Sequence, residues 1–505
     1  MNPIRKNMLF AAVGLAFALA LAACGGGNDG GGVSFGTVSG TAVNAATGQP
    51  VAGAIVTDGA ASATTDANGR FTLTRAAGDC TLTISAAGYE TTSRTSFVAP
   101  GQASTLNWAL TGSHGTYVDY AAVPPAQQVP AAAMNYVVLA WNDLGMHCAQ
   151  DDYSYFLILP PFNTLHAQVI QRGVGVVTSG ITVSYSFPNK TNSALHTNFW
   201  NYSSNYQYRV KYGWNSVTNV GITGTPLAGA MSIDPKGLGF VATGIPITPY
   251  DDNGTWDPYG TATITVTDST SGVVLATTSV VAPISTELNC GNCHGTANTF
   301  LNILQMHDKH NNTTLVADQA AGKLHLCAEC HADNALGLSG KTGVENLSLA
   351  MHNFHKDKMS VSADPGNPNC FNCHPGPRTR CLRGIMSHAG KSCADCHGDM
   401  YGMAAALAAG RQPWAQEPRC GDCHDSKHAE NSNTLYRNSV LGNTPNPKMN
   451  GQIYCEACHN STHAEYTSTN PADNIIPQQY QGDNYWIWNC YVCHNDYMPS
   501  PAMHM

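Results

Sequence analysis

The chain has 505 residues, which is enough for about three domains. Only 11% of them are charged, while glycine and proline are abundant, so the composition predicts strands, turns and loops rather than long surface helices. The formal net charge of −9 argues against nucleic acid as a partner.

A targeting segment is predicted at residues 1–24. Arg5 and Lys6 form a basic start, and the apolar run at 9–21 is too short to span a membrane comfortably. The four residues that end in Cys24 (Leu-Ala-Ala-Cys) resemble a bacterial lipobox, which implies cleavage before Cys24 and lipidation of that cysteine. An ordinary secretory signal with an incidental cysteine is the alternative. Two or three acyl chains would give firm anchoring.

A Gly-rich stretch at residues 25–36 is predicted to be a flexible tether. Glycine, and no aspartate, follows Cys24 directly, and by resemblance to sorted bacterial lipoproteins this favours the outer membrane. The prediction is a lipid-anchored protein exposed at the cell surface, with the periplasmic face as the alternative.

Residues 37–112 predict a small all-β domain, because short β-prone runs alternate with turn residues. The runs lie at 37–43, 54–57, 71–74 and 81–85. The stretches ATGQPV (46–51), TDANGRF (65–71) and AGY (87–89) resemble the carboxypeptidase regulatory-like β-sandwich. The resemblance implies a structural or adhesive module and not a peptidase. Cys80 is expected to face inward as a small apolar residue.

Residues 113–285 predict a second β-sandwich or a barrel. Their β-prone runs lie at 136–140, 180–185, 228–233, 261–266 and 272–281. Met146, His147 and Cys148 stand side by side, and two interpretations stay open. Either His147 or Met146 reaches a metal centre at the domain border, or the stretch is a structural turn with a disulfide cysteine. His166 and His196 share this ambiguity.

Residues 286–505 repeat the pattern Cys-x-x-Cys-His seven times. Numbered one to seven in chain order, the motifs are Cys290-Cys293-His294, Cys327-Cys330-His331, Cys370-Cys373-His374, Cys393-Cys396-His397, Cys420-Cys423-His424, Cys455-Cys458-His459 and Cys490-Cys493-His494. This is the attachment signature of c-type haem: the cysteines form thioethers and the histidine becomes the proximal iron ligand. The sequence therefore predicts seven haem c groups.

Zinc is the competing interpretation, since Cys-x-x-Cys pairs also build zinc ribbons. Zinc sites need no histidine directly after every second cysteine, and a thioredoxin-like role needs only one such pair. Aliphatic runs are scarce between the motifs, so the porphyrins are expected to form the core of a multihaem cytochrome c domain with short helices and long loops. Without haem this domain is not expected to fold.

The distal ligands are expected among the remaining histidines. The candidates are His307, His310, His325, His352, His355, His388, His428, His463, His504 and His147. His428 and His463 each follow a motif histidine by four residues; on a helix both would point the same way as that histidine, so each is expected to serve a neighbouring haem. Methionine is an alternative ligand, although filling gaps between porphyrins is the first expectation for Met386, Met400, Met403 and Met503.

Three cysteines remain besides Cys24 and those in the motifs: Cys80, Cys148 and Cys381. An oxidising compartment allows one disulfide among them. The prediction is a Cys148–Cys381 bond that ties the second β domain to the haem domain.

An iron held by two histidines offers no open position, so it can only gain and lose an electron. The haem domain resembles the outer-membrane multihaem c-type cytochromes of metal-reducing bacteria. The resemblance implies an electron carrier, and not an enzyme with a specific substrate. It implies extracellular acceptors such as ferric oxides, humics, electrodes or partner cells. It also implies other cytochromes or an outer-membrane porin–cytochrome complex as partners.

Three alternatives stay open. A multihaem reductase acting on nitrite, hydroxylamine or a sulfur oxyanion would keep one haem five-coordinate; a lysine in place of a motif histidine would be its nearest sign, and none of the seven motifs has it. A cytochrome filament would donate histidines between subunits. In the third, the β domains act as adhesins and the haems are cargo.

Overall fold

A computed structural model describes residues 35–44, 49–87, 89, 91–98, 100–110, 134–295, 298–358, 369–376, 379–414, 416, 418 and 453–495. The predicted lipidation site Cys24, motif five, His428, His504 and Met503 lie outside these residues. No helix within the described ranges is long and apolar enough to cross a membrane.

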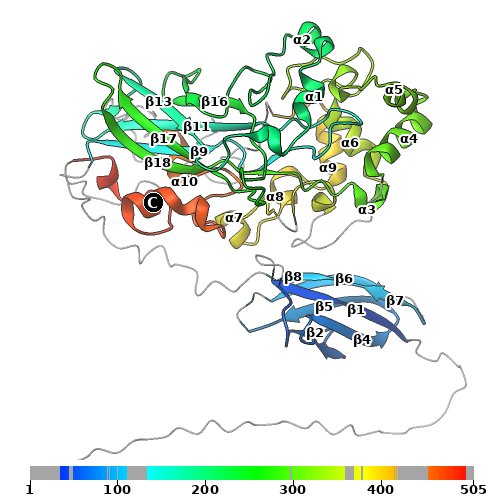
Figure 1. Ribbon diagram of the computed structural model, residues 1–505. Helices are drawn as coiled ribbons and strands as arrows, with labels where there is room; N and C mark the ends of the chain where they lie inside the picture. The colour runs from blue at the N-terminus through cyan, green and yellow to red at the C-terminus, as the bar shows by residue number, and fades with distance from the viewer. Residues whose placement is uncertain are drawn as a thin grey trace, which may run out of the picture.

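The N-terminal unit is a sandwich of two β-sheets (Figure 1). One sheet contains β4 (Arg70–Ala76), β1 (Phe35–Asn44), β7 (Ala103–Thr105) and β8 (Trp108–Leu110), and the other contains β3 (Ser62–Thr64), β2 (Ile55–Thr57), β5 (Gly78–Ser85) and β6 (Thr92–Val98). Alternate residues of each strand point into a common core, which includes Val38, Leu73 and Leu82. Cys80 is buried in this core, as predicted. The predicted β-sandwich is confirmed.

The turn before β4 shows why this sequence folds as it does. The Asp66 carboxylate accepts hydrogen bonds from the backbone N–H groups of Asn68 and Arg70, both at 2.8 Å. Gly69 adopts φ +72°, and a Cβ there would strike the Ala42 carbonyl. Glycine meets both demands, because it has no Cβ.

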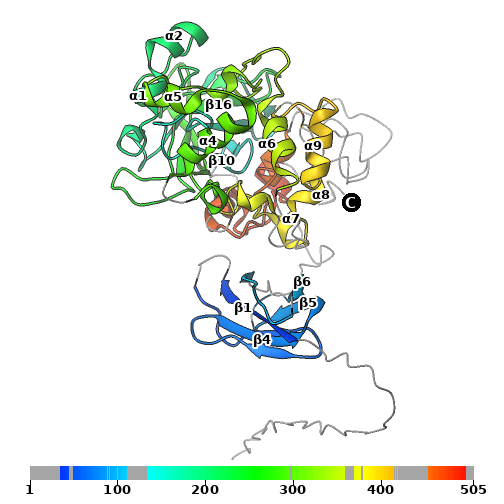
Figure 2. The same cartoon turned by 90° about the vertical axis from the view of Figure 1, so that its right-hand side faces the viewer.

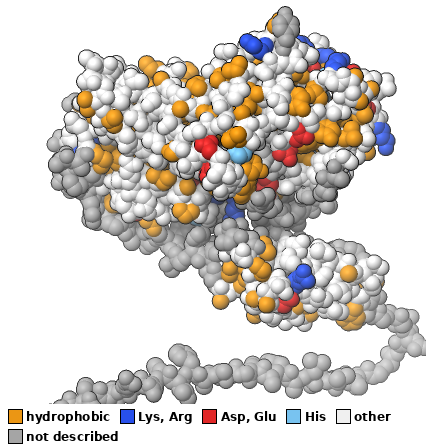
Figure 3. Space-filling model, in the orientation of Figure 1, with side chains coloured by type: hydrophobic (Ala, Val, Ile, Leu, Met, Phe, Trp, Pro, Cys, Tyr) orange, Lys and Arg blue, Asp and Glu red, His pale blue; other side chains and the backbone are white. Residues whose placement is uncertain are grey.

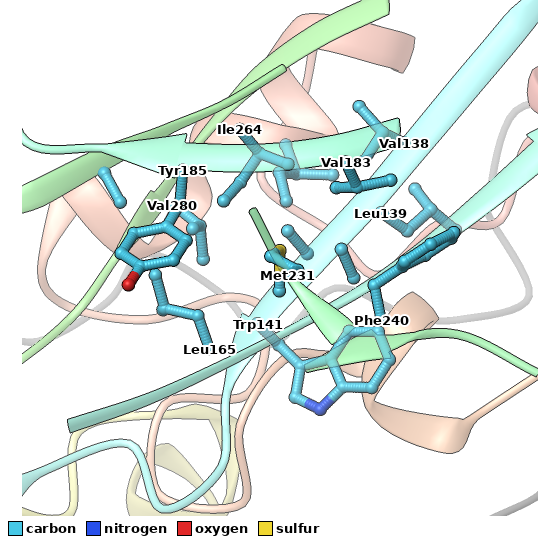
Figure 4. Close-up of a cluster of buried hydrophobic side chains, with 14 of the residues drawn as sticks. Val138, Leu139, Trp141, Leu165, Val183, Tyr185, Met231, Phe240, Ile264 and Val280 are labelled. Carbon is cyan, nitrogen blue, oxygen red and sulfur yellow. The ribbon is translucent and has the colours of Figure 1, made fainter. Parts of the chain in front are cut away.

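A second pair of sheets follows. One contains β9 (Tyr136–Asn142), β11 (Asn163–Gln171), β12 (Gly175–Val176), β16 (Phe240–Ile245) and β15 (Ser232–Ile233), and the other contains β14 (Gly229–Ala230), β13 (Ile181–Ser186), β17 (Thr261–Asp268) and β18 (Val274–Val281). A short ladder joins β10 (His147–Cys148) to β19 (Ile284–Ser285) in parallel. Figure 4 shows the apolar side chains that both sheets contribute, with Met231 among those of β9, β11 and β17.

All five β-prone runs of this region contain strand residues, but the run 228–233 is divided between β14 and β15 in different sheets. The long strand β11 was not expected. β11 has the sequence NTLHAQVIQ, and nearly all of its residues are buried, on both faces. A strand in this environment has no alternation of apolar and polar residues, so the pattern that predicts half-buried strands does not find it.

The C-terminal region has short helices joined by loops, as predicted (Figure 2). The α-helices are α3 (Gly291–His294), α4 (Thr299–Asn311), α5 (Leu315–Ala320), α6 (Leu347–His355), α7 (Ile385–His388), α8 (Cys393–His397), α9 (Met400–Ala408), α10 (Cys455–His459) and α11 (Ile475–Gln481). The 3₁₀ turns are η3 (Cys327–Glu329), η4 (Asn369–Asn372), η7 (Pro471–Asn474) and η8 (Cys490–Val492). Helices α6 and α9 pack side by side.

The second β region and the end of the chain share one hydrophobic core. Ala457, Ile476, Ile487 and Val492 pack in the same cluster as the side chains of β9 and β11. This shared core contains residues from both sides of residue 286, where the sequence analysis placed a domain boundary. An aliphatic core is therefore present here, where the sequence analysis expected only porphyrins.

A third, aromatic cluster connects the β region to motif two. It lies beneath α1 (Phe199–Ser203) and α2 (Tyr206–Tyr212) and contains Tyr153, Trp214 and Leu326. Leu326 directly precedes the first cysteine of motif two, and the Cys327 N–H donates to the Leu157 carbonyl at 3.0 Å. Charged side chains are sparse on the face in Figure 3, in line with the composition.

Candidate functional site

Each described motif folds as one helical turn. The histidine N–H donates to the carbonyl of the first cysteine in motif one (2.9 Å), motif two (3.0 Å), motif three (2.7 Å) and motif seven (2.9 Å). Residues four apart lie on one face of a helical turn, so the turn presents the first cysteine and the histidine to the same side.

One continuous cavity of about 3940 Å³ runs through the C-terminal region. The two cysteines and the histidine of all six described motifs line it. A pocket for one drug-sized ligand measures roughly 300–1,000 Å³, so this cavity has room for several large cofactors. The motifs, which are spread over 205 positions of the sequence from Cys290 to His494, therefore converge on a common space.

Four motif histidines each face a second histidine in this cavity. The ring centroids are 6.4 Å apart for His294 and His355, 6.3 Å for His331 and His307, 6.3 Å for His374 and His352, and 6.2 Å for His397 and His463. Metal–imidazole bonds are about 2 Å long and the ring centre lies about 1 Å further, so two imidazoles on one metal have centroids about 6 Å apart. The centroid distances are thus compatible with a metal between the two rings of each pair.

Hydrogen bonds at Nδ1 prepare these rings as ligands. Four rings donate from Nδ1 to a backbone carbonyl: His331 to Glu345 (2.8 Å), His352 to Ser348 (2.8 Å), His355 to Met351 (2.7 Å) and His463 to Leu144 (2.6 Å). A carbonyl oxygen only accepts, so Nδ1 carries a proton, and in the neutral form of each ring Nε2 keeps the lone pair that a metal needs. His294 and His307 have side-chain partners instead, Asn302 Oδ1 and Thr313 Oγ1, both at 2.8 Å.

Burial keeps several of these imidazoles neutral. It lowers the pKa of His374 and of His397 to about 4, with help from neighbouring histidines. Burial also lowers the pKa of His307 and His352. Because the neutral ring is the ligand, these groups are in the binding form at neutral pH.

His463 differs from these histidines because its pKa is raised. Burial opposes protonation, but the charge on Cys381 and a hydrogen bond with its thiol raise the pKa of His463 to about 9. A metal at Nε2 would therefore compete with a proton at this ring. The sequence analysis treated His463 as helical, but α10 ends at His459 and Asn460 has φ +70°. The ring nevertheless lies by His397 of motif four.

Other predicted ligands are engaged elsewhere. Carboxylates hold both nitrogens of His325, Asp318 at 2.8 Å and Glu329 at 3.2 Å. The Nε2 of His147 lies 2.6 Å from Asp143. Because of these contacts, neither ring is placed as the second ligand opposite a motif histidine.

The remaining histidines have other surroundings. His310 lines the cavity with its ring 5.2 Å from that of Phe354, whereas His388 is not among the lining residues. His166 stacks on Trp141 at 5.5 Å and His196 on Tyr250 at 5.4 Å. Met386, Met400 and Met403 line the cavity.

Cys148 and Cys381 are free thiols in the structure, so the predicted disulfide is not formed. Burial raises the pKa of Cys148, and the charge of Cys381 adds to it. The Cys381 sulfur has a different partner, the Nδ1 of His463, at 3.9 Å. Both cysteines line the cavity.

The sequence analysis missed residues that support the site. Glu345, Ser348 and Asn302 hold motif or facing histidines by hydrogen bonds. Ser348 and Met351 lie four residues before the histidines that they contact, a helical spacing that could have indicated them. Among the described residues, no three His, Cys, Asp or Glu side chains form a preassembled metal cluster.

Residues 37–111 match the carboxypeptidase regulatory-like domain. No curated protein matches the chain. The matched residues are those of the N-terminal sandwich, from β1 to β8.

Solved structures give only weak similarity. A minor pilin of Streptococcus agalactiae, GBS52, is 18% identical over 17% of this chain and 48% of its own, with a TM-score of 0.14. The Bacillus anthracis TIE protein is 12% identical over 50% of this chain and 31% of its own, with a TM-score of 0.18. A DUF3823 family protein from Bacteroides ovatus is 12% identical over 49% of this chain and 98% of its own, with a TM-score of 0.13.

Proposed function

We propose that this protein is a multihaem electron carrier with one haem c at each of its seven motifs. The observation that carries the proposal is the cavity in which four motif histidines face second histidines at 6.2–6.4 Å. The donor set fits haem: two cysteines for thioethers, a proximal histidine and, in four cases, a distal histidine.

The protein's own groups position and shield the cofactors. When bound, haem iron with two histidine ligands supplies one-electron chemistry and no open site for a substrate. Backbone carbonyls orient His331, His352, His355 and His463, and burial excludes water and keeps the rings of His374 and His397 neutral. At the four motifs with a facing histidine, this arrangement supports electron transfer rather than catalysis on a specific substrate.

The proposal extends to location and partners. Cys24 would carry the lipid anchor at the outer membrane, with the folded part exposed at the cell surface. Electrons would come from other cytochromes or from a porin–cytochrome complex and pass to extracellular acceptors. The carboxypeptidase regulatory-like domain would serve as a spacer or adhesive module near the membrane.

The test is a haem count on protein made in cells with the c-type attachment machinery. We expect a pyridine haemochrome spectrum and a mass that correspond to seven haems, and a mostly low-spin ferric paramagnetic resonance spectrum. The variant Cys327→Ser should alter attachment at one haem only. The matched control Cys80→Ser, in the N-terminal sandwich, should leave all seven. A blank haemochrome spectrum would refute the proposal, and a dominant high-spin signal that binds nitrite would point to a reductase.

A further inference from the structure

We infer that the six described motifs form a file in the order two, one, three, four, six, seven, in which α4 and α6 connect neighbouring motifs. This inference rests on the proposed function for the nature of the cofactors. The order itself follows from contacts among the chain's own residues. Motif five lies outside the described residues and is not placed.

Helix α4 connects motifs two and one. Its Asn302 side chain holds Nδ1 of His294, the motif-one histidine, at 2.8 Å. Five residues later, His307 faces His331 of motif two. Five residues rise about 7.5 Å along an α-helix, so both motifs lie along one short helix.

Helix α6 connects motifs one and three. His355 faces His294 of motif one, and His352 faces His374 of motif three. Helical residues three apart have Cβ atoms about 5–6 Å from each other, so the two facing rings start from neighbouring points. Asn346 caps the helix through the Leu349 N–H at 2.8 Å.

A direct bond strengthens the contact between motifs one and three. The side-chain amide of Asn289, which precedes motif one, donates to the carbonyl of Phe371 within motif three at 2.8 Å. Motif one therefore has a neighbour on each side, motif two through α4 and motif three through α6.

Motif three continues to motif four. Helix α9 begins three residues after His397 of motif four and packs beside α6, whose His352 faces His374 of motif three. His463, which faces His397, also has its Nδ1 3.9 Å from the Sγ of Cys381, seven residues after His374. Motifs three and four are thus adjacent through α6, α9 and His463.

Motif four connects to motif six through His463. This residue follows the motif-six histidine His459 by four positions, yet its ring faces His397. The Tyr466 N–H donates to the His459 carbonyl at 2.9 Å, so the segment that carries His463 loops back to motif six. Motif six therefore cannot lie far from motif four.

Motif six continues to motif seven. The Ile487 N–H, three residues before motif seven, donates to the Cys458 carbonyl of motif six at 3.0 Å. The next residue back, Trp486, stacks against His459 with centroids 6.1 Å apart. Motif seven ends the file, where the Arg172 guanidinium donates to the His494 carbonyl at 3.2 Å.

The two ends of the file lie against the second β region. Motif two contains Glu329, which accepts from Lys211 at 3.0 Å and Tyr212 at 2.9 Å, both on α2. Motif seven meets Arg172 at the end of β11. Motifs two and seven are thus the ends of the six placed motifs, and motif one, the first in sequence, is internal.

The experiment removes one proposed distal histidine at a time and measures whether a haem then binds carbon monoxide. His352→Ala and His355→Ala should each add carbon monoxide binding at one of the seven haems of the reduced protein, and His352→Met should restore six-coordination without that binding. His310→Ala, a matched control that lines the same cavity, should add none. Two outcomes would overturn the role of α6. One is carbon monoxide binding added by His310→Ala, and the other is no added binding in either α6 variant.

The order is tested by the iron positions in an experimental structure of the haem-loaded protein. We expect the iron of motif one to have those of motifs two and three as its nearest placed neighbours, and motif six to lie between motifs four and seven. Another order would overturn the inference while leaving the haem count intact. A protein without haem would overturn the proposed function instead, so the two failures are distinguishable.

Discussion

Arg383 is 1% exposed, and its guanidinium donates to both carboxylate oxygens of Asp473, at 2.6 and 2.8 Å. Nothing in the local sequence marks this arginine, because its partner lies 90 positions away. It also donates to the Gly145 carbonyl, and so joins the β9–β10 connection to the C-terminal region. A charge this deep is tolerated only because it is paired.

We predict that Arg383→Met destabilises the haem-loaded protein by about 3–5 kcal/mol, because Asp473 would be left as an unpaired buried charge. Denaturant unfolding followed by circular dichroism measures this. The control Lys323→Met removes an exposed ion pair with Asp318 and should cost at most about 1 kcal/mol. Equal effects of the two variants would contradict the prediction.

The buried histidines predict a pH dependence. Burial lowers the pKa of His374 and of His397 to about 4, against 6.5 for a free imidazole, and iron bound at these rings in the haem-loaded protein would likewise keep them neutral. Between these values the unfolded chain binds more protons than the folded chain, so stability is full above pH 6.5 and falls as the pH drops toward 4. Unfolding curves at pH 7.5, 6, 5 and 4 measure this. A stability that stays constant or rises on acidification would refute it.

At the scale of elements, α11 shows how the end of the chain is held on the second β region. The Tyr480 hydroxyl accepts from the Val138 N–H and donates to the Val138 carbonyl, both at 3.1 Å. The Gln479 side chain makes a similar contact with Thr278 of β18 at 2.8 Å. The sequence analysis did not anticipate this, because the hydroxyl of one tyrosine joins residues 342 positions apart.

We predict that Tyr480→Phe destabilises the protein, since it removes two hydrogen bonds worth about 0.5–1.5 kcal/mol each from a buried position. Tyr401→Phe is the matched control: its hydroxyl bonds Asp357 at an exposed site, so the change should stay within about 0.5 kcal/mol. Thermal unfolding of both variants gives the comparison. A Tyr480→Phe protein as stable as the parent would show that packing alone holds α11.

At the scale of the whole molecule, the N-terminal sandwich and the rest of the chain differ in what completes their cores. The sandwich closes its own core with aliphatic side chains, including Val38 and Ile84. The C-terminal region surrounds a cavity of about 3940 Å³, and an apolar space of this size needs contents to be stable.

We therefore predict that the chain made without haem attachment keeps a folded N-terminal sandwich and loses order around the motifs. Limited proteolysis should leave a resistant fragment that corresponds to residues 35–110, whereas the haem-loaded protein should resist cleavage through both regions. A haem-free chain that resists cleavage around Cys327 and Cys370 would contradict this prediction.

The chain's local patterns predicted strands at 37–43, 54–57, 71–74 and 81–85 of the N-terminal sandwich, short helices in the C-terminal region and the set of histidines available as ligands. Those features depend on residues within a few positions of one another. Tertiary structure alone decided which histidine faces which motif, the shared core of β9 and α11, and the burial of Arg383. Each of these joins residues tens to hundreds of positions apart, and only packing brings such residues together.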